Sequence, residues 1–370
     1  MTVPSATRAE IHLDRLRHNV DVIQKKLGVI ELIGVVKANG YGHGSVRVAT
    51  TLCAMGVKQL AVATVAEAIV LREAGISASI LVFAPPTARS MAFYHEFGLD
   101  AIVDSDHSLS VVSSLNEPIH CHVKVDTGMG RLGQSVAMSV DLIKNVERHP
   151  TAKLASIWTH FARGDEPDSD FTLVQFERFM SLKKALGGVA APFHCAASGA
   201  TFAFPQTIDP SCMSMARIGI ALYGLLDLPG NEASLDLQPV MEFKSEITAI
   251  KTVPKGTPIS YGNRWTAPSE RVIATIGAGY ADGVSRSLTN KGHVRIQGKR
   301  YPMVGTVCMD MFMVDLGEPD QVDRSIQIGS ETSIFGLHLP TCIEVAHLTN
   351  SITYVQVCGI SGRVPRNYLP

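Results

Sequence analysis

The chain has 370 residues, more than a single domain usually holds, so its length predicts one large domain and a second one. Lysine and arginine total 33 against 34 for aspartate and glutamate, which gives a formal net charge of −1. This balance offers no electrostatic basis for binding nucleic acid or an anionic membrane, so we expect a small-molecule ligand.

The N-terminal residues 1–10 lack the charged and then apolar pattern of a signal peptide, and no run of about 18 apolar residues occurs in the chain. We therefore expect a cytoplasmic protein. The seven cysteines are odd in number and widely spaced, and none belongs to a C-x-x-C pair. For this reason we expect no zinc site and no other metal.

Short apolar runs alternate with amphipathic stretches through the first 228 residues. A helical stripe from Leu13 to Leu27 comes first. Eight strand-like runs follow, at residues 33–38, 60–64, 80–84, 101–104, 121–126, 155–161, 193–198 and 215–220. Eight parallel strands with intervening helices close into a TIM-type (β/α)8 barrel, which we expect over residues 10–228.

The rhythm changes after residue 226. Pro229-Gly230-Asn231 predicts a linker, and β-branched runs at 240–252, 271–276, 293–296, 311–314 and 332–335 recur without long helical stripes between them. We therefore expect a mostly β domain over residues 229–370, joined by an N-terminal strand from residues 1–9 that continues to about residue 12. The predicted fold class is α/β, a barrel followed by a mostly β domain.

Reactive groups of such a barrel gather at the carboxyl ends of its strands, and phosphates often bind at the loops after strands 7 and 8. Lys37 is expected to end strand 1, and His160 lies near the end of strand 6. Ser198 is expected to end strand 7, and Gly219 and Ile220 to end strand 8. The Ser198 hydroxyl and the Gly219 amide suit a phosphate, although residues of these types are more often simple turn residues.

Lys37 closes an apolar run and opens a glycine-rich segment at residues 37–44, Lys-Ala-Asn-Gly-Tyr-Gly-His-Gly. Burial lowers the pKa of an amine, which a Schiff-base lysine requires, whereas an isolated lysine after a strand usually reaches solvent. The segment resembles the pyridoxal-phosphate motif of alanine racemases, which usually has alanine where this chain has Gly40. The resemblance implies that Lys37 carries the cofactor and that Tyr41 contacts it.

Arg217 places a permanently charged guanidinium in an apolar strand, which is costly unless the group meets an acceptor. A salt bridge across the barrel would supply one. In the resembled family the matching arginine hydrogen-bonds the pyridine nitrogen of pyridoxal phosphate and keeps it unprotonated. The ring is then a weaker electron sink, and side reactions such as transamination are suppressed.

Racemisation needs one group to take the α-proton from one face of the substrate and another to return it on the opposite face. By the resemblance, Lys37 serves one face and Tyr261 the other. Tyr261 belongs to the β domain, which in this family approaches the barrel of the other subunit, so a homodimer with shared active sites is implied. A tyrosine, with an ordinary pKa of about 10, needs positive charge or hydrogen bonds to act as a base, and His160 is the candidate.

A second motif is the segment 123–131, Val-Lys-Val-Asp-Thr-Gly-Met-Gly-Arg. In the resembled family the equivalent of Lys124 is often carbamylated, which turns a cation into an anion that orients Arg131, and this arginine holds the substrate carboxylate. An ion pair with an acidic neighbour or a bound chloride is the alternative for Lys124.

Three further residues match family positions near the entrance of the site. Tyr280 and Met309 match residues of the substrate pocket, the latter through its backbone amide, and Tyr354 matches a tyrosine that binds the phosphate. Without the resemblance, Tyr280 and Met309 would be residues of surface loops, and Tyr354 would be a structural aromatic residue of the β domain.

The sequence therefore predicts a pyridoxal-phosphate-dependent alanine racemase, an isomerase that supplies D-alanine for peptidoglycan. A racemase of broader specificity, which also accepts serine, is an alternative. A pyridoxal-phosphate decarboxylase of the same plan typically places an acidic residue against the ring nitrogen, where this chain has Arg217. A non-catalytic pyridoxal-phosphate-binding barrel would resemble only the first half of the chain.

Overall fold

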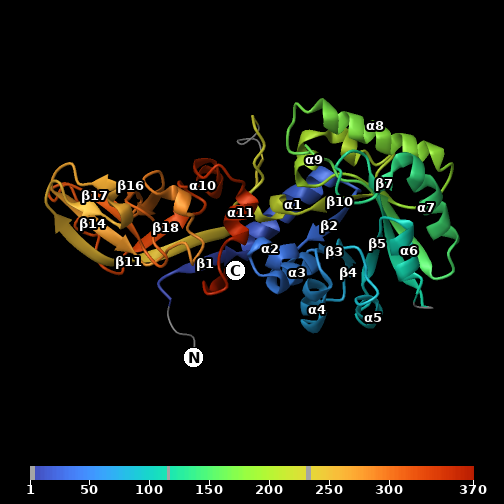
Figure 1. Cartoon of the computed structure of the whole chain (residues 1–370), viewed down its shortest axis with the longest axis horizontal. Helices are drawn as coiled ribbons and strands as arrows, with labels where there is room; N and C mark the ends of the chain where they lie inside the picture. The colour runs from blue at the N-terminus through green and yellow to red at the C-terminus, as the bar shows by residue number, and fades with distance from the viewer. Residues whose placement is uncertain (1–4, 115–116, 231–234) are drawn as a thin grey trace.

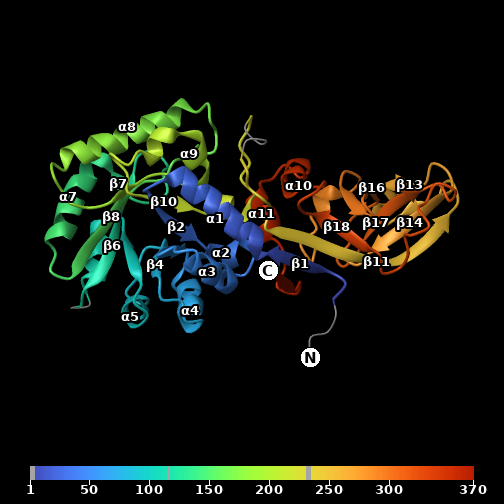
Figure 2. The same cartoon turned by 180° about the vertical axis from the view of Figure 1, so that it is seen from behind.

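The computed structural model describes residues 5–114, 117–230 and 235–370. Figure 1 shows an elongated molecule with a barrel at one end and a β-rich domain at the other. Strand β1 and helix α11, from opposite ends of the sequence, lie between them in both views (Figures 1 and 2). In these described ranges, every helix is too short or too polar to cross a membrane.

Eight parallel strands form the barrel and pair in the order β10-β2-β3-β4-β5-β6-β8-β9. A parallel bridge between Ala197 and Arg217 joins the chain after β9 to β10 and closes the ring. The barrel expected from the sequence is confirmed. The strands are β2 (Glu31–Val35), β3 (Gln59–Val62), β4 (Ser79–Val82), β5 (Asp100–Val103), β6 (Ile119–Asp126), β8 (Ala152–Trp158), β9 (Phe193–His194) and β10 (Met215–Ile218), and β7 (Gln134–Ser135) pairs with β6 outside this path.

Helices cover the outside of the barrel, as Figure 2 shows for α1 and α8. The predicted apolar stripe of α1 is buried at Leu16, Val20, Ile23 and Leu27, and burial of each such side chain contributes about 2 kcal/mol to the hydrophobic stabilisation. The helices are α1 (Leu13–Leu27), α3 (Ser45–Ala54), α4 (Val65–Glu73), α5 (Met91–Glu96), α6 (Asp106–Val112), α7 (Val136–Arg148), α8 (Asp170–Ala185) and α9 (Ser198–Ala203), with 3-10 turns η1 (Pro205–Ile208) and η2 (Ile220–Tyr223).

Several predicted strands extended too far at their carboxyl ends. β2 ends at Val35, so Lys37 opens the short turn α2 (Lys37–Tyr41) and does not end a strand. Ser198 begins α9, and β10 ends at Ile218, before Gly219 and Ile220. After β9 and β10 the apolar runs continue because Cys195, Ala196 and Ile220 are also buried, so apolar pattern alone misplaces the strand ends. After β2, Val36 is buried but Ala38 is exposed.

The second domain is built on the long strand β11 (Met241–Val253), which pairs with β18 through its first half and with β14 through its second. The pairing continues from β14 through β17, β16 and β15 to β18, so these strands form a closed ring. The remaining strands are β12 (Pro258–Ile259), β13 (Trp265–Thr266), β14 (Arg271–Ile276), β15 (His293–Ile296), β16 (Lys299–Val304), β17 (Phe312–Gly317), β18 (Glu331–Phe335) and β19 (Arg366–Leu369), with η3 (Tyr261–Asn263), η4 (Arg286–Leu288), α10 (Cys342–Leu348) and α11 (Thr353–Cys358).

The predicted runs at 271–276 and 293–296 coincide with β14 and β15, whereas β16 and β19 were not predicted because charged residues and a proline interrupt their apolar pattern. β1 (Arg8–His12) lies between β11 and β19 in the sheet of the second domain. The domain boundary at residues 228 and 229 stays a prediction, since Asn231 of the expected linker lies outside the described residues.

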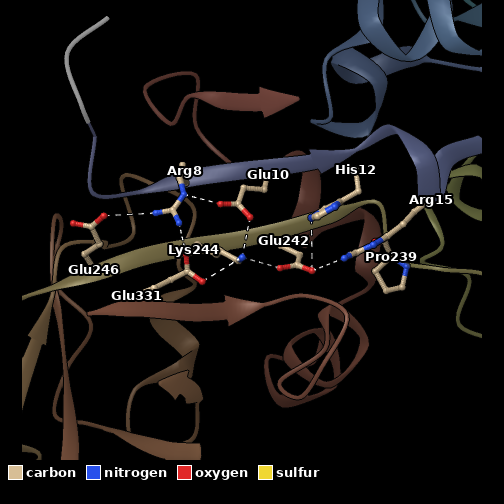
Figure 3. A network of polar contacts seen from close by, with 9 residues as sticks. All are labelled: Arg8, Glu10, His12, Arg15, Pro239, Glu242, Lys244, Glu246 and Glu331. Atoms are coloured by element: carbon tan, nitrogen blue, oxygen red, sulfur yellow. Dashed lines mark hydrogen bonds and ion pairs between the residues drawn. The ribbon is translucent and has the colours of Figure 1, made fainter. Parts of the chain in front are cut away.

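A ladder of alternating charges fastens β1 to β11 (Figure 3). Lys244 Nζ lies 2.8 Å from Glu10, 3.0 Å from Glu242 and 3.2 Å from Glu331. Arg15, at the start of the barrel helix α1, lies 2.8 Å from the same Glu242. The ladder therefore links the first domain to the sheet of the second.

We predict that Lys244→Met destabilises the protein by about 2 kcal/mol at pH 7, because two half-buried carboxylates lose a charged donor. Burial raises the pKa of Glu10 and Glu242, but the hydrogen bonds and charges of Lys244 and of a neighbouring arginine, Arg8 or Arg15, together outweigh it and lower both pKa values. This stabilisation is therefore full above the ordinary glutamate pKa of about 4.3 and is lost as the pH falls through the lowered values.

Urea unfolding at pH 7 and at about pH 3 measures this difference, which should shrink at the lower pH. Lys299→Met is the matched control, since Lys299 is 64% exposed and lies 3.5 Å from Asp323, and its loss should be below about 0.5 kcal/mol. An equal cost of Lys244→Met at both pH values would contradict the prediction.

Candidate active site

A cavity of about 490 Å³ lies at the carboxyl ends of the barrel strands. It brings together ten of the residues that the sequence singled out, whereas Tyr261, Tyr280 and Met309 do not line it. The ten are Lys37, Tyr41, Lys124, Arg131, His160, Ser198, Arg217, Gly219, Ile220 and Tyr354.

The turn after β2 is left-handed. Ala38, Asn39, Gly40 and Tyr41 have φ values of 51°, 54°, 62° and 52°. This conformation costs about 1 kcal/mol or more at each residue that carries a Cβ. Gly40, at the position where the resembled family usually has alanine, adopts it at little cost. The turn places both Lys37 and Tyr41 on the wall of the cavity.

The C-terminal segment of the same chain holds this turn in place. Gly42 packs so closely against α11 that a Cβ there would lie 2.2 Å from the Val357 carbonyl oxygen. Arg366 Nε donates a hydrogen bond to the Gly42 carbonyl oxygen at 3.0 Å. The rings of Tyr41 and Tyr354 lie 5.9 Å apart. Both domains therefore position the lysine turn.

The Lys37 amine is prepared to act as a nucleophile. Burial, followed by the nearby charge of Arg131, lowers its pKa below the ordinary lysine value. Nζ lies 5.9 Å from the centre of the Phe83 ring, and among the described residues it makes no hydrogen bond. A half-buried amine with a lowered pKa reaches more readily the neutral form that attacks a carbonyl carbon.

Hydrogen-bond donors gather at one wall of the cavity. The amides of Gly219 and Ala221 donate to Ser198 Oγ at 3.0 and 3.3 Å. A Cβ at Gly219 would lie 2.4 Å from Tyr41 Oη, so only glycine leaves room for the phenol there. Burial raises the pKa of Tyr41 and of Tyr354 above the ordinary tyrosine value, so both phenols keep their protons and can donate. This wall suits an anion such as phosphate.

Arg217 is buried in the barrel, with 2% of its surface exposed. One terminal nitrogen donates to His194 Nδ1 at 2.7 Å, and the other donates to the Thr159 and Cys195 carbonyl oxygens at 2.8 and 3.0 Å and to His160 Nδ1 at 3.2 Å. Burial lowers its pKa to about 10, so it remains a cation at neutral pH.

The ion pairs of the described residues do not include Arg217, so the structure does not support a salt bridge across the barrel. In the same part of the chain Nε has no hydrogen-bond partner, although the side chain lines the cavity. This N–H is therefore left to bind an acceptor atom of a ligand.

His160 is neutral at physiological pH because burial, followed by the charge of Arg217, holds its pKa well below the usual range. Since Arg217 only donates, His160 Nδ1 must accept, and its proton is on Nε2. The Nε2–H of His160 is therefore a donor beside the cavity, and a positive charge on this ring is not supported.

Lys124 is 1% exposed and donates to the Val125 carbonyl oxygen at 2.6 Å. Nζ lies 5.2 Å from the centre of the Trp158 ring, and the ion pairs between described residues do not include it. Burial, followed by the charge of Arg217, lowers its pKa to about 7. A substantial fraction of neutral amine, the form that reacts with carbon dioxide, is therefore present near pH 7.

The sequence reasoning missed His194 and Thr159, which bind Arg217. A signal for such residues exists in the inward-facing positions of the strands. His122 and Lys124 alternate with valine along β6, and His194 ends β9 after a buried phenylalanine. Polar residues at the buried positions of a barrel strand indicate an internal network.

Tyr261, Tyr280 and Met309 lie on loops of the second domain and are 74%, 46% and 53% exposed. The loops are neighbours, since the Tyr280 amide donates to the Cys308 carbonyl oxygen at 3.0 Å. Exposed large apolar side chains grouped in this way are typical of a surface that another chain covers. Within one chain, the structure does not bring these residues to the cavity.

The fold and the cavity define a barrel enzyme with a reactive lysine and a strongly cationic ligand site. The family model for the N-terminal domain of alanine racemase matches residues 11–227, and that for the C-terminal domain matches residues 240–368. The chain belongs to the alanine racemase family.

Individual relatives cover the whole chain. The alanine racemase of Chlorobaculum tepidum is 38% identical over 98% of this chain and 95% of its own. The solved alanine racemase of Clostridium difficile 630 has a TM-score of 0.90 at 34% identity, over 100% of this chain and 97% of its own. The solved biosynthetic alanine racemase of Pseudomonas aeruginosa has a TM-score of 0.91 at 29% identity, over 99% of this chain and 100% of its own.

We predict that Lys124 titrates near pH 7 in the cofactor-free protein, because burial and the charge of Arg217 disfavour its ammonium form. Carbon-13 labelling of the lysine ε-carbons and NMR titration from about pH 5 to 11 would show one such signal, absent from Lys124→Met. The prediction fails if the signal lost in that variant titrates at the ordinary lysine pKa of about 10.4.

Proposed function

We propose that this protein interconverts L- and D-alanine with pyridoxal phosphate as cofactor, and that the D-alanine serves peptidoglycan synthesis. The observation that carries the proposal is the set of cations around one cavity. Lys37, Lys124, Arg131 and Arg217 all line it, against Asp165 as the acidic residue among its described lining residues. Such a site binds a ligand that carries phosphate and carboxylate groups.

The residues of the cavity fit pyridoxal phosphate. The hydroxyls of Tyr41, Ser198 and Tyr354 and the Ile220 amide would hold the phosphate, together with the Gly219 amide, which would share its N–H between the phosphate and Ser198 Oγ. Arg217 Nε would donate to the ring nitrogen. Lys37 would bind the aldehyde carbon covalently. When bound, this cofactor supplies an electron-withdrawing group that acidifies the α-carbon of an amino acid. The Arg217 guanidinium would share its N–H proton in a hydrogen bond without transferring it, so the ring nitrogen would stay unprotonated.

Two residues would move the α-proton. The Lys37 amine would take or return it on one face, and Tyr261 of a second copy of the chain would do so on the other, as expected from the sequence. His160 Nε2–H would hydrogen-bond the phenol oxygen of this tyrosine. The exposure of Tyr261 in the single chain, 74%, supports a contribution to another subunit. The protein would then be a homodimer with shared active sites.

The substrate carboxylate would be held by Arg131 and by the backbone amide of Met309. A carbamate on Lys124 would orient Arg131 by its negative charge, and the lowered pKa of Lys124 supports this modification. Tyr280 of the second copy would narrow the pocket toward a methyl side chain. Comparing the rates for alanine and serine tests this selectivity, and equal rates would favour the broader racemase.

A decarboxylase and a non-catalytic pyridoxal-phosphate carrier have less support. The buried cation Arg217 stands where a decarboxylase would place an acid, and a carrier would lack the second domain whose family model matches residues 240–368. The cytoplasmic location stays a prediction.

We predict that Lys37→Ala abolishes racemisation and that Tyr261→Phe cripples proton abstraction from one enantiomer. A heterodimer with one subunit of each variant should recover about half of the wild-type turnover, because one of its two shared sites contains both wild-type residues. Different affinity tags on the two subunits allow the heterodimer to be purified, and deuterium exchange at the α-carbon measures each direction.

The matched control pairs the double variant Lys37→Ala/Tyr261→Phe with a wild-type subunit. This heterodimer has the same residue content, but with shared sites it holds no intact pair. If Lys37 and Tyr261 instead act within one chain, the control keeps one intact site and the first heterodimer keeps none, which is the opposite result.

We predict that Gly219→Ala weakens pyridoxal-phosphate binding by at least about tenfold, or about 1.4 kcal/mol, because its Cβ displaces the Tyr41 phenol. Titration of the cofactor-free protein, followed by visible absorption, measures the affinity. Gly362→Ala is the control, since a Cβ there meets nothing within 4 Å. Equal affinities of the two variants would exclude the phenol and this glycine as parts of the phosphate site.

A further inference from the structure

A line of polar side chains crosses the interior of the barrel from its amino end to Arg217. Each member comes from one of five neighbouring strands: Asp100 from β5, His122 from β6, Ser156 from β8, His194 from β9 and Arg217 from β10. All are buried, with 0% to 5% of their surface exposed. Barrel interiors are normally filled by branched apolar residues, so a line of polar side chains through this barrel requires a structural or functional explanation.

The contacts along the line are continuous. Arg217 lies 2.7 Å from His194 Nδ1, and His194 Nε2 lies 2.9 Å from Ser156 Oγ. Ser156 Oγ lies 2.6 Å from His122 Nδ1, and His122 Nε2 lies 3.4 Å from the Asp100 carboxylate. The line therefore joins the cation at the cavity to a carboxylate at the opposite end of the barrel.

With a single proton on each histidine, one arrangement of protons satisfies every contact. Arg217 only donates, so His194 Nδ1 accepts and His194 donates from Nε2 to Ser156. Ser156 then donates its hydroxyl proton to His122 Nδ1, and His122 donates from Nε2 to Asp100. Burial, followed by the charge of Arg217, holds the pKa of His194 well below its usual range, which agrees with the single proton that this arrangement gives it.

Asp100 is ionised at the end of this line. Burial raises the pKa of its carboxyl group, but hydrogen bonds from His120 and His122 outweigh burial and hold the pKa well below its ordinary value. The Ser79 hydroxyl also donates to it. A buried carboxylate and a buried guanidinium are each costly when unpaired. Every hydrogen bond between Arg217 and Asp100 donates toward the carboxylate, so the chain polarises in one direction and stabilises both charges.

We infer that Asp100 is the remote counter-charge of Arg217, and that His194, Ser156 and His122 transmit it and fix the guanidinium in the orientation that leaves Nε free toward the cavity. These four are positioning residues, since none lines the cavity. The inference rests on the proposed function only in identifying the acceptor for Nε as the ring nitrogen of pyridoxal phosphate.

The first test uses the cofactor-free protein, so that it is independent of racemase activity. Nitrogen-15 NMR of labelled histidines at pH 7 should show His194 and His122 protonated on Nε2, with assignments from single His→Gln variants. Asp100→Asn should shift the His194 Nε2–H resonance in the wild-type background and leave it unmoved in Ser156→Ala, where the line is broken. Protonation of His194 on Nδ1, or the same shift in both backgrounds, overturns the inference.

The second test uses the holoenzyme. Ser156→Ala should lower kcat/KM roughly tenfold, the lower end of the loss that follows removal of an outer partner of a functional group. In the Ser156→Ala background, Asp100→Asn should cause no further loss of kcat/KM. If the two substitutions instead acted independently on the structure, their losses would add. Ser156→Thr should restore the hydroxyl and most of the activity, and the line is disproved if threonine behaves as alanine does.

Matched controls exclude general effects of burial. Ser139→Ala removes a fully buried hydroxyl that donates to backbone oxygens of β7, at 2.9 and 3.1 Å. Asp315→Asn removes a buried carboxylate that pairs with Arg271 at 2.6 Å in the second domain. Both control variants should leave the His194 resonance and kcat/KM unchanged. A tenfold loss of kcat/KM in either control would show that the Ser156 and Asp100 variants report packing alone.

Discussion

A guanidinium buried in a barrel strand without an adjacent carboxylate is the constraint on which the site depends. Arg217 binds three carbonyl oxygens and two imidazoles that face it from β9 and from the segments that follow β8 and β9. These partners are in place because β9 and β10 close the ring. Closure of the barrel therefore brings the partners of Arg217 together, and their hydrogen bonds use the terminal nitrogens of the guanidinium, so that in the described part of the chain the Nε–H is left for a ligand.

The same burial gives the cavity its chemistry. Burial, followed by the charge of a nearby arginine, lowers the pKa values of both Lys37 and Lys124. His160 is kept neutral for the same reason. A cationic cavity attracts anionic ligands and also favours the uncharged form of its own amines, so ligand binding and nucleophile activation have a common physical origin.

The second domain contributes to the barrel in two ways. Its C-terminal helix packs on the left-handed turn that follows Lys37, and Arg366 binds the Gly42 carbonyl oxygen. Its N-terminal strand and Lys244 ladder fasten the two domains together. The exposed loops with Tyr261 and Met309 do not line the cavity of their own chain, so one domain supports the site of its chain and also presents an exposed apolar surface.

The periodicity of the sequence determined the eight-stranded barrel and the mostly β domain, because periodicity is a local signal. The residues that meet at the cavity followed mainly from the resemblance of short motifs to those of alanine racemases. It misplaced the ends of β2, β9 and β10, since apolar runs continue into buried loops. Only the tertiary structure decided what Arg217 and Lys124 contact and which polar residues connect Arg217 to Asp100. Those contacts join strands that are distant in sequence, and no local pattern specifies which side chains face each other across a closed barrel.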